Sequence, residues 1–473
     1  MSYILGRFNL SWIVILCLLS FFTANDIFCA VNSDVQDKLY LKKPVTESKN
    51  CSKGENKYID RANSLYKLKE FKKAIDYYSK AILINSQCWK AYEGRGISYF
   101  YIGKYLNANA DFVNALKINS NAHGAYNGRA MILIKTGFYD YALEQINKAI
   151  KICPQDDESL WINKGTILEH LKKHNKSIKA FSMAIKINPN SKVAFLKRSI
   201  SRVEADNIDE ALDDLEAARN IDPNDPRIYR LISSYASREN DREKEMWALD
   251  KLVEVEPDND KNYFSRGLER LIEDDFKLSY ADFDRAIKIN PNNPEYFYYR
   301  GKISILQKDL CKGISDLKHA LLLQEGYTDA KELLARSYIE IGDDQIAKTM
   351  LDNLLLSKPH DIDILNTICW LLATSRNDDI RDGSRAVKLL KPFIGKKYRS
   401  ISESMYISIL DTFASALAET KNFDAAVRIQ KEVVNRAKTK LEKEALVKYE
   451  NRLKSFKQGK PWRYKPLYEL KCK

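Results

Sequence analysis

The amino-acid sequence predicts an all-α solenoid, in which helix–turn–helix repeats stack on one another. Similar segments recur along the 473-residue chain at steps of 34 or 35 residues, and steps of this size are the signature of helical repeat arrays. Small residues and prolines recur at the same steps. Glycine and proline are also sparse, with 17 and 12 residues, which favours long helices over many short strands.

Two ladders of small residues mark the helices of each repeat. The first helices carry Ala62, Gly96, Ala130, Gly165, Ser199, Ser233, Gly267, Gly301 and Ala335. The second helices carry Ala81, Ala115, Ala149, Ala184, Ala218, Ala286 and Ala320. Small side chains at fixed positions let paired helices approach closely, and a larger side chain would push them apart. A single repeat cannot bury both of its faces, so neighbouring repeats have to stack.

Prolines predict where helices end and begin. Those that follow a second helix are Pro154, Pro189, Pro223, Pro257, Pro291 and Pro359. Proline lacks an amide hydrogen and clashes with the preceding turn, so it ends a helix. Pro226 and Pro294 are instead expected in the first turn of the next helix, where the missing hydrogen is harmless.

These ladders resemble those of the tetratricopeptide repeat family. The resemblance covers about residues 55 to 440, with nine repeats over residues 55–361 and two divergent repeats over residues 362–440. Residues 441–473 form a capping helix and a basic tail in this interpretation, and they look like a terminal module of many bacterial members. The resemblance implies a right-handed superhelix whose first helices line a concave groove for a protein partner.

The N-terminus has the pattern of a secretory signal peptide over residues 1–30. Arg7 precedes an apolar run of residues 10–24, which is short for a membrane span. Cleavage near Ala30 predicts a secreted or periplasmic protein that begins with a polar lead-in, residues 31–54. The alternative is a protein that stays anchored in the membrane by residues 10–24.

Cysteines are compatible with an oxidising compartment. Six remain after the predicted cleavage, and no pair has the close spacing of a metal or redox motif. Cys51 and Cys88 are the pair to test as a disulfide, because each is expected near the start of neighbouring first helices. The alternative is that the cysteines are unpaired thiols.

No constellation of catalytic or cofactor-binding residues is found. The chain lacks a phosphate loop of the GxxxxGK type, an HExxH motif and a GxSxG motif. His170 and His174 have a spacing that can hold a metal ion, but no third ligand is in view, so a solvated helix end is favoured. We therefore predict a non-enzymatic protein without cofactor or metal.

The C-terminal tail is strongly basic. Residues 452–473 hold eight Lys or Arg against one acidic residue, a net charge of +7 out of +13 for the whole chain. Trp462 and Tyr464 are interleaved with these charges, so contact with nucleic acid or an anionic membrane is conceivable. A structural cap is the favoured interpretation, and no nucleic-acid partner is expected.

The family resemblance implies groove positions that are second, fifth, ninth, twelfth and thirteenth in each repeat. In the first three repeats these positions include Asn63, Tyr66, Tyr101 and Asn127. Asparagine amides both donate to and accept from an extended backbone, and aromatic rings add contact area. A peptide site is predicted here, although polar and aromatic residues are also common at such positions without a ligand.

Asp284 to Gly301 is an aromatic stretch that could suggest a stacking surface for bases or sugars. Its arginine, Arg300, is in register with Arg61, Arg95, Arg129, Arg198 and Arg266, so it belongs to the repeat. Of its four aromatic residues, only Tyr298 is expected to face the groove.

The sixth repeat places Arg227, Arg230 and Arg238 at groove positions, with Lys261 in the next repeat. Like charges without partners repel, so the cluster predicts an acidic ligand. The competing account is pairing with acids on nearby helices, such as Glu204 or Glu239.

The predicted function is therefore a protein–protein interaction scaffold that binds an extended or acidic protein segment in its groove. The alternative is an envelope module that binds an anionic polysaccharide or cell-wall polymer through the same arginines and aromatics.

Overall fold

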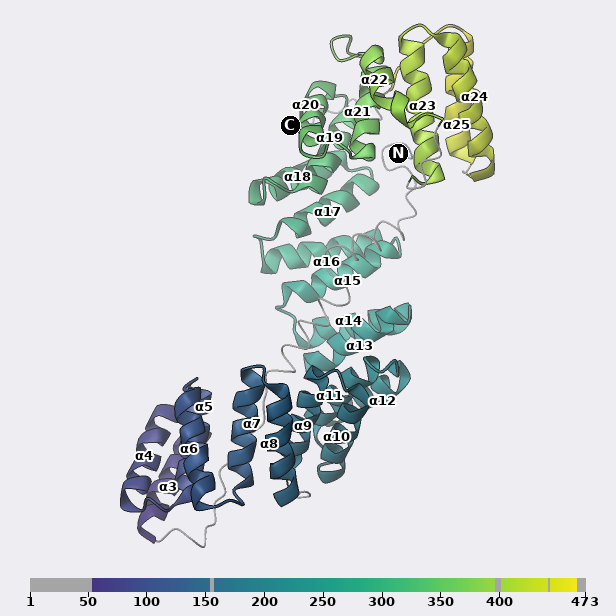
Figure 1. The fold of residues 1–473 in the computed structure, drawn as a ribbon. Helices are drawn as coiled ribbons and strands as arrows, with labels where there is room; N and C mark the ends of the chain where they lie inside the picture. The colour runs from purple at the N-terminus through teal and green to yellow at the C-terminus, as the bar shows by residue number, and fades with distance from the viewer. Residues whose placement is uncertain (1–52, 154–156, 396–400, 441–442, 466–473) are drawn as a thin grey trace. The chain divides into compact units, whose positions relative to one another are not determined.

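The computed structural model describes residues 53–153, 157–395, 401–440 and 443–465. These residues form α-helices and one short 3-10 helix, with no strand among them. The two helices of each repeat pack as antiparallel neighbours joined by a short turn (Figure 1). The prediction of an all-α stack of helical repeats is confirmed.

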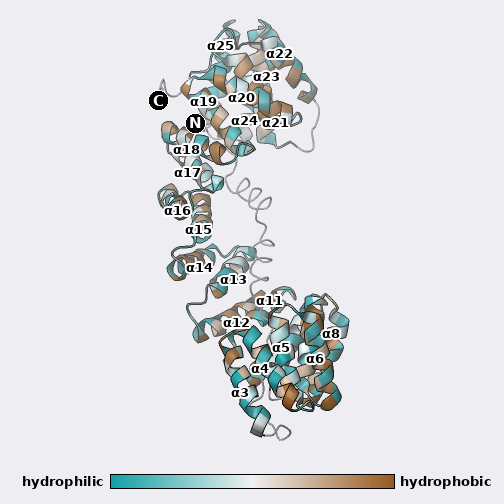
Figure 2. Ribbon diagram, turned by 90° about the vertical axis from the view of Figure 1, so that its left-hand side faces the viewer, coloured by the Kyte–Doolittle hydropathy of each residue, from teal (hydrophilic) through white to brown (hydrophobic). Residues whose placement is uncertain are grey.

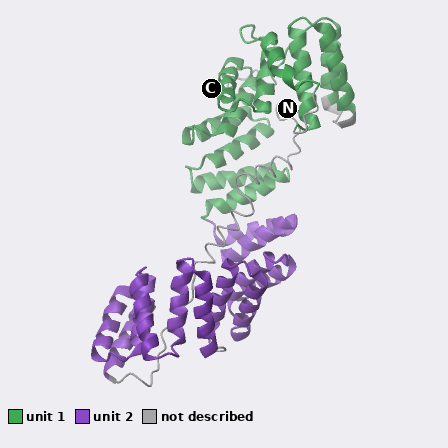
Figure 3. Cartoon of the chain, in the orientation of Figure 1, with its two compact units in different colours: residues 1–18, 258–473 green, residues 19–257 purple. Residues whose placement is uncertain are grey.

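Two compact units make up the chain (Figure 3), and each is described by itself. The unit that ends at Pro257 holds six helix pairs. Their bounds are α3 (Lys53–Lys67), α4 (Phe71–Ile84), α5 (Trp89–Tyr101), α6 (Tyr105–Ile118), α7 (His123–Lys135), α8 (Tyr139–Ile152), α9 (Glu158–His170), α10 (His174–Ile187), α11 (Lys192–Val203), α12 (Ile208–Ile221), α13 (Pro226–Arg238) and α14 (Arg242–Val255). We call this the N-terminal unit.

The C-terminal unit begins at Asp258 and continues the same pattern. Its regular helices are α15 (Asp260–Ile272), α16 (Phe276–Ile289), α17 (Pro294–Leu306), α18 (Leu310–Leu323), α19 (Thr328–Ile341) and α20 (Asp344–Ser357). They are followed by α21 (Ile362–Thr374), α22 (Gly383–Leu390), the 3-10 helix η1 (Lys391–Phe393), α23 (Glu403–Glu419), α24 (Phe423–Lys440) and α25 (Lys443–Lys457). Figure 2 shows that most helices carry both hydrophilic and hydrophobic residues, as expected of helices with one buried face.

Among the described residues, prolines lie at the helix ends and helix starts that the sequence predicts. Pro226 and Pro294 are the first residues of α13 and α17. Pro189 and Pro291 come two residues after the last residues of α10 and α16. Proline therefore limits helix length at both ends of a repeat, as its chemistry requires.

Close helix approach explains the ladder of small residues. A methyl group added at Gly96 would lie 2.8 Å from Cε1 of Phe112, and one at Gly165 would lie 2.6 Å from Cζ of Phe181. Both rings belong to the second helix of the same repeat and are fully buried. The glycines thus leave the space that a buried aromatic ring fills.

A recurring ion pair explains the ladder of arginines. Arg198 binds Asp214 with Nη2 and Oδ1 2.6 Å apart, and Arg300 binds Asp316 at 2.7 Å. The pairs Arg95–Asp111 and Arg266–Asp282 have the same spacing of 16 residues. Each pair joins the first helix of a repeat to the second helix of the same repeat. Arg300 is therefore part of the repeat, as predicted.

The turn inside each regular repeat contains one residue with a positive φ. These residues are Lys69, Gly103, Gly137, Lys172, Asp206, Asn240, Asp274, Lys308 and Gly342, again at steps of 34 or 35 residues. Only three of them are glycines, the residue that adopts this conformation without strain. The turns are therefore alike in conformation although they differ in sequence.

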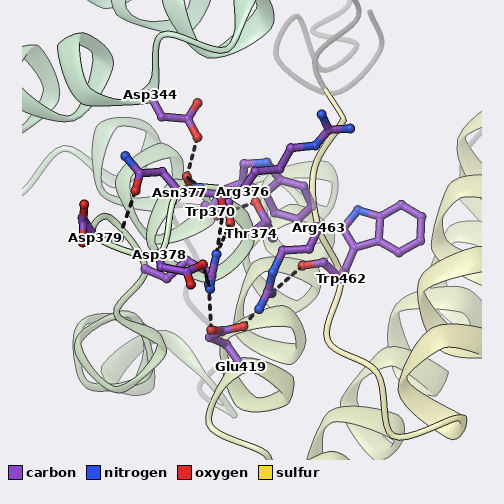
Figure 4. A network of polar contacts seen from close by, with 12 residues as sticks. Asp344, Trp370, Thr374, Arg376, Asn377, Asp378, Asp379, Glu419, Trp462 and Arg463 are labelled. Carbon is purple, nitrogen blue, oxygen red and sulfur yellow. Dashed lines mark hydrogen bonds and ion pairs between the residues drawn. The ribbon is translucent and has the colours of Figure 1, made fainter.

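The basic tail packs back onto the C-terminal unit. Trp462 and Tyr464 contact its hydrophobic core, and the Tyr464 hydroxyl donates to Glu340 at 2.5 Å. Arg463 binds Glu419 at 2.6 Å (Figure 4). Arg381, in the loop between α21 and α22, binds the same carboxylate at 3.0 Å. Residues 462–464 are thus part of the folded end of the stack, in line with a structural cap.

The four described cysteines differ in whether they form a disulfide bond. Cys88 and Cys311 are disulfide-bonded, whereas Cys153 and Cys369 are free thiols. The alternative of unpaired thiols is therefore wrong for the first two. Cys51, the predicted partner of Cys88, lies outside the described residues.

The predicted signal segment, the predicted anchor and the polar lead-in up to residue 52 also lie outside the described residues. Within the described ranges, no helix is long and apolar enough to cross a membrane.

Candidate functional site

The first helices of successive repeats form one continuous face of the N-terminal unit. Contacts run from α3 to α5, from α5 to α7, from α7 to α9 and from α9 to α11. We call this the first-helix face. Every predicted site residue lies on a first helix, and Asn63, Tyr66, Tyr101 and Asn127 belong to this face.

Asn63 and the aromatic residues beside it lie at the start of the first-helix face. The Asn63 side chain is buried and accepts a hydrogen bond of 2.6 Å from the Tyr78 hydroxyl. Its Nδ2 group has no hydrogen-bond partner within the described chain. Tyr66 packs edge-on against Tyr101, which is 41% exposed and stacks on Phe71 with ring centroids 5.0 Å apart.

Asn127 is a second buried asparagine of the first-helix face, two repeats beyond Asn63. We call the buried polar side chains of this face the polar row. Asn127 is buried in α7 and its Oδ1 accepts a hydrogen bond of 2.9 Å from Nδ2 of Asn163 in α9. The two asparagines thus join neighbouring repeats by a direct amide contact.

Glu93 is the charged member of this row, and it lies on α5 between the two asparagine sites. Its carboxylate accepts a hydrogen bond from the Ala125 amide in the first turn of α7, where helix dipole and carboxylate attract each other. Gly124 makes room for it, because a methyl group there would lie 2.6 Å from Glu93 Oε1. The second oxygen, Oε2, has no hydrogen-bond partner among the described residues.

Burial dominates the electrostatics of Glu93. Desolvation raises its pKa from 4.5 to about 7, against the opposing effects of Lys90 and the Ala125 amide. Asp157 raises the pKa further. The side chain is therefore close to half-protonated at neutral pH and can act as a donor or an acceptor.

Sequence reasoning missed Glu93, although a signal for it exists. Glu93 occupies the fifth position of its repeat, the same groove position as Asn127. The position was therefore sufficient to find it, whereas its burial and raised pKa depend on the packing of α7.

A second buried charge lies further along the first-helix face. Lys197 of α11 is almost fully buried, and its charge lowers the pKa of Glu169, which burial raises. The Ser201 hydroxyl donates to Glu169 at 2.8 Å. The polar row therefore extends from α3 to α11.

The arginine cluster of the sixth repeat does not match its prediction. Arg227 binds Asp225 with Nη2 and Oδ2 2.5 Å apart, and Arg230 binds Glu256. The premise that these arginines lack partners is wrong, because nearby carboxylates pair with both. The competing account, in which acids on nearby segments pair with the arginines, is correct for Arg227 and Arg230. The acids are Asp225 and Glu256 rather than Glu204 or Glu239.

Arg238 and Lys261 complete the predicted cluster. Arg238 is exposed at the end of α13, where its charge lowers the pKa of Tyr235 against the stronger effect of burial. Lys261 is exposed near the start of α15, in the C-terminal unit. The structure therefore does not describe the four basic residues as one site.

Tyr298 lies on α17 of the C-terminal unit and is half-buried. Its ring packs against Tyr299 and Tyr327, with centroids 5.0 and 5.1 Å apart. Tyr296 and Phe297 beside it are buried. The apparent stacking surface is thus largely internal packing.

His170 and His174 stand on two different helices, at the end of α9 and the start of α10. His170 stacks on Tyr139 with ring centroids 4.4 Å apart. No group of three potential metal-binding side chains occurs among the described residues. His170 therefore contributes to aromatic packing between repeats.

Comparison with known families identifies the repeats. Family models for the tetratricopeptide repeat match residues 56–88, 93–157 and 158–191. These segments cover most of α3 and α5 and all of α4 and of α6 to α10, and so most of the first-helix face.

Two curated relatives match a short part of the chain. One is the DnaJ homolog subfamily C member 7 homolog of Dictyostelium discoideum, 27% identical over 97 residues. The other is the small glutamine-rich tetratricopeptide repeat-containing protein 2 of Mycosarcoma maydis, 32% identical over 89 residues. The matches cover 20% and 19% of this chain, and 18% and 25% of the relatives.

Solved structures of similar repeats include YrrB, a tetratricopeptide repeat protein described as having an unusual peptide-binding site. It is 23% identical, with a TM-score of 0.34, over 38% of this chain and 93% of its own. The C-terminal part of a repeat protein from Cytophaga hutchinsonii is 16% identical, with a TM-score of 0.45, over 50% and 97%. Both TM-scores are below 0.5, so no functional statement is taken from these structures.

Proposed function

The chain is a tetratricopeptide repeat protein, and on that premise we propose that it holds an extended protein segment against its first-helix face. Such repeats indicate a protein–protein interaction scaffold, so the proposal concerns where and how a partner binds. We place the site on α3, α5, α7 and α9 of the N-terminal unit.

The observation that carries this proposal is the row of buried polar side chains on those helices. Asn63, Glu93, Asn127 and Asn163 are all at most 6% exposed. Stacking of repeats needs only small and apolar residues, and each buried polar group costs about 1–3 kcal/mol when it lacks a partner. In this row Asn63 Nδ2 and Glu93 Oε2 lack such a partner among the described residues, and a local loss of stability of this kind is typical of a binding surface.

An extended segment offers what this row lacks. Its backbone carbonyl groups can accept from Asn63 Nδ2, and its amide groups can donate to Glu93 Oε2, the two atoms without partners in the described chain. Tyr101 adds an exposed aromatic surface at the edge. Asn63 and Glu93 are buried, so a segment that reaches them has to displace the side chains that cover them.

A peptide selection tests the proposal. Random peptides displayed on phage would be selected on the full chain, and the affinity of enriched peptides measured for the wild type and for Asn63→Ala. Loss of one hydrogen bond lowers affinity by about 2- to 10-fold. Asn107→Ala, an exposed change on α6, is the matched control and should leave affinity unchanged.

Two outcomes contradict the proposal. Either no peptide is enriched, or the enriched peptides bind Asn63→Ala and wild type equally while circular dichroism shows that both are folded.

The arginine cluster no longer supports an acidic protein segment or an anionic polysaccharide as the ligand. Both proposals relied on arginines without partners, and Arg227 and Arg230 are bonded to carboxylates. The contacts of Arg227 and Arg230 therefore favour neither ligand over an uncharged extended segment in the groove.

Export from the cytoplasm is a separate proposal. It is supported by the apolar run at residues 10–24 and by the disulfide-bonded Cys88 and Cys311, because disulfides persist in oxidising compartments. An alkaline phosphatase fusion to the C-terminus should be active in a bacterial host, and N-terminal sequencing should begin near residue 31. An inactive fusion in the cytoplasm would exclude export, and an intact N-terminus in the membrane fraction would favour the anchor.

A further inference from the structure

The turns inside the first and fourth repeats are strongly basic, and those of the second and third repeats hold one lysine each. We define the turn edge as residues 67–73, 101–107, 135–141 and 170–176, which occupy equivalent positions in repeats one to four. Together they hold nine lysines against Glu70 and Asp140, a net charge of +7. All nine lysines are exposed.

This charge is confined to one edge of the repeats. The turns on the opposite edge contain no lysine or arginine. Residues 84–88, 118–122 and 187–191 carry no charge at all, and residues 152–157 carry only Asp156 and Asp157. The equivalent intra-repeat turn of the fifth repeat, residues 204–210, carries four acids and no base, and that of the sixth, residues 238–244, is neutral. A general excess of lysine would not produce such a pattern.

Large apolar side chains project from the same turns. The exposed fractions are 89% for Leu106, 69% for Leu68, 64% for Tyr141, 56% for Phe138 and 41% for Tyr101. Stacking of the repeats does not need Leu106, Leu68, Tyr141 or Phe138, because more than half of each side chain is in solvent. An exposed group of apolar residues among charges is typical of an interaction surface.

The turns follow one another along the stack. Phe71 of the first turn stacks on Tyr101 of the second, and Tyr139 of the third stacks on His170 of the fourth, with centroids 5.0 and 4.4 Å apart. The equivalent residue of each turn also has the same positive φ. The lysines and apolar tips are thus presented side by side.

We propose that the turn edge docks the N-terminal unit on an anionic lipid bilayer. Lysines near the surface interact with acidic headgroups, while leucine and aromatic side chains enter the boundary between headgroups and acyl chains. An acidic protein partner would complement the charge, but it does not by itself account for exposed apolar side chains in three successive turns. The turn edge adjoins the first-helix face proposed for peptide binding and shares Tyr101 with it.

Vesicle co-sedimentation tests this docking with the full chain. Phosphatidylcholine vesicles are compared with equimolar phosphatidylcholine–phosphatidylglycerol vesicles, and stronger binding to the anionic ones is expected. Every variant retains residues 10–24, so any contribution of that apolar segment is common to all of them and differences between variants report on the turn edge.

The charge variant combines Lys67→Gln, Lys69→Gln and Lys72→Gln. Each lysine near an anionic surface contributes about fivefold, so the partition constant should fall on the order of 100-fold. Lys80→Gln, Lys117→Gln and Lys151→Gln form the matched control, because these exposed lysines lie toward the other ends of α4, α6 and α8. The control should lose less than about tenfold.

The apolar variant combines Leu68→Ser, Leu106→Ser and Phe138→Ser, which change only exposed side chains. It should lower partitioning by about tenfold or more, because each tip loses apolar burial. Equal binding to both kinds of vesicle, or equal losses in the charge variant and its control, would overturn the proposal. If an acidic model peptide binds through these lysines while vesicles do not, the edge is a protein site instead.

Discussion

Replacing the buried Glu93 by glutamine should stabilise the N-terminal unit at neutral and alkaline pH. Burial raises the folded-state pKa of Glu93 from 4.5 to about 7. Between these values the native chain retains a proton that the unfolded chain has released, so stability falls as pH rises from about 4.5 through 7 and is constant above. The difference of about 2.5 units corresponds to a loss of up to ~3 kcal/mol.

Glutamine keeps the oxygen that accepts from Ala125 and cannot ionise, so Glu93→Gln avoids this loss. The unfolding free energy of both proteins would be measured by urea titration followed by circular dichroism, at several pH values from 5 to 9. The advantage of the variant should be just under ~1 kcal/mol at pH 5 and rise to ~3 kcal/mol above pH 8.

Glu144→Gln is the matched control, because Glu144 is exposed and paired with Lys148, which lowers its pKa. This control should show no gain that rises with pH. A pH-independent difference between Glu93→Gln and wild type would refute the reasoning, because it would show that Glu93 has an ordinary pKa in the folded chain.

Three further changes test the packing of the repeats. Gly165→Ala should destabilise the chain by about 1–3 kcal/mol in urea unfolding, because its methyl group meets a buried phenyl ring, whereas Gly326→Ala, with nothing within 4 Å of the new methyl, should not. Asp214→Asn should cost about 3 kcal/mol or more by thermal or urea unfolding, because it leaves a largely buried arginine without its carboxylate. Lys172→Gly should stabilise by about 0.5–1 kcal/mol, since it relieves a positive φ, while Lys176→Gly inside α10 should cost about 1 kcal/mol.

Much of the fold follows from periodicity. Pro226 and Pro294 were expected in the first turn of a helix, and they are the first residues of α13 and α17. Gly165 and Ala62 could be placed at close helix contacts, because only small residues recur there. Such features depend on local sequence and on a repeated register, and both are visible in a single chain.

Other features of the fold could not be predicted from the repeat pattern. The left-handed residue of each turn is hidden because Lys69, Asp206 and Asn240 stand where glycine would be recognised. Arg227 and Arg230 were expected to lack partners, since the acids that bind them follow no obvious repeat.

The candidate site could be predicted only in part. Asn63 and Asn127 were found from their positions, but the buried state of Glu93 depends on how α7 packs on α5. Position in a repeat therefore identifies candidates, whereas burial and charge state require the neighbouring helix.

Hydrogen–deuterium exchange of the full chain, with and without a peptide from the phage selection, tests the central claim most directly. The account predicts slower exchange on peptide binding in α3, α5, α7 and α9, with little change in the turn edge. Protection confined to the turn edge, or to helices of the C-terminal unit alone, would contradict binding at the first-helix face.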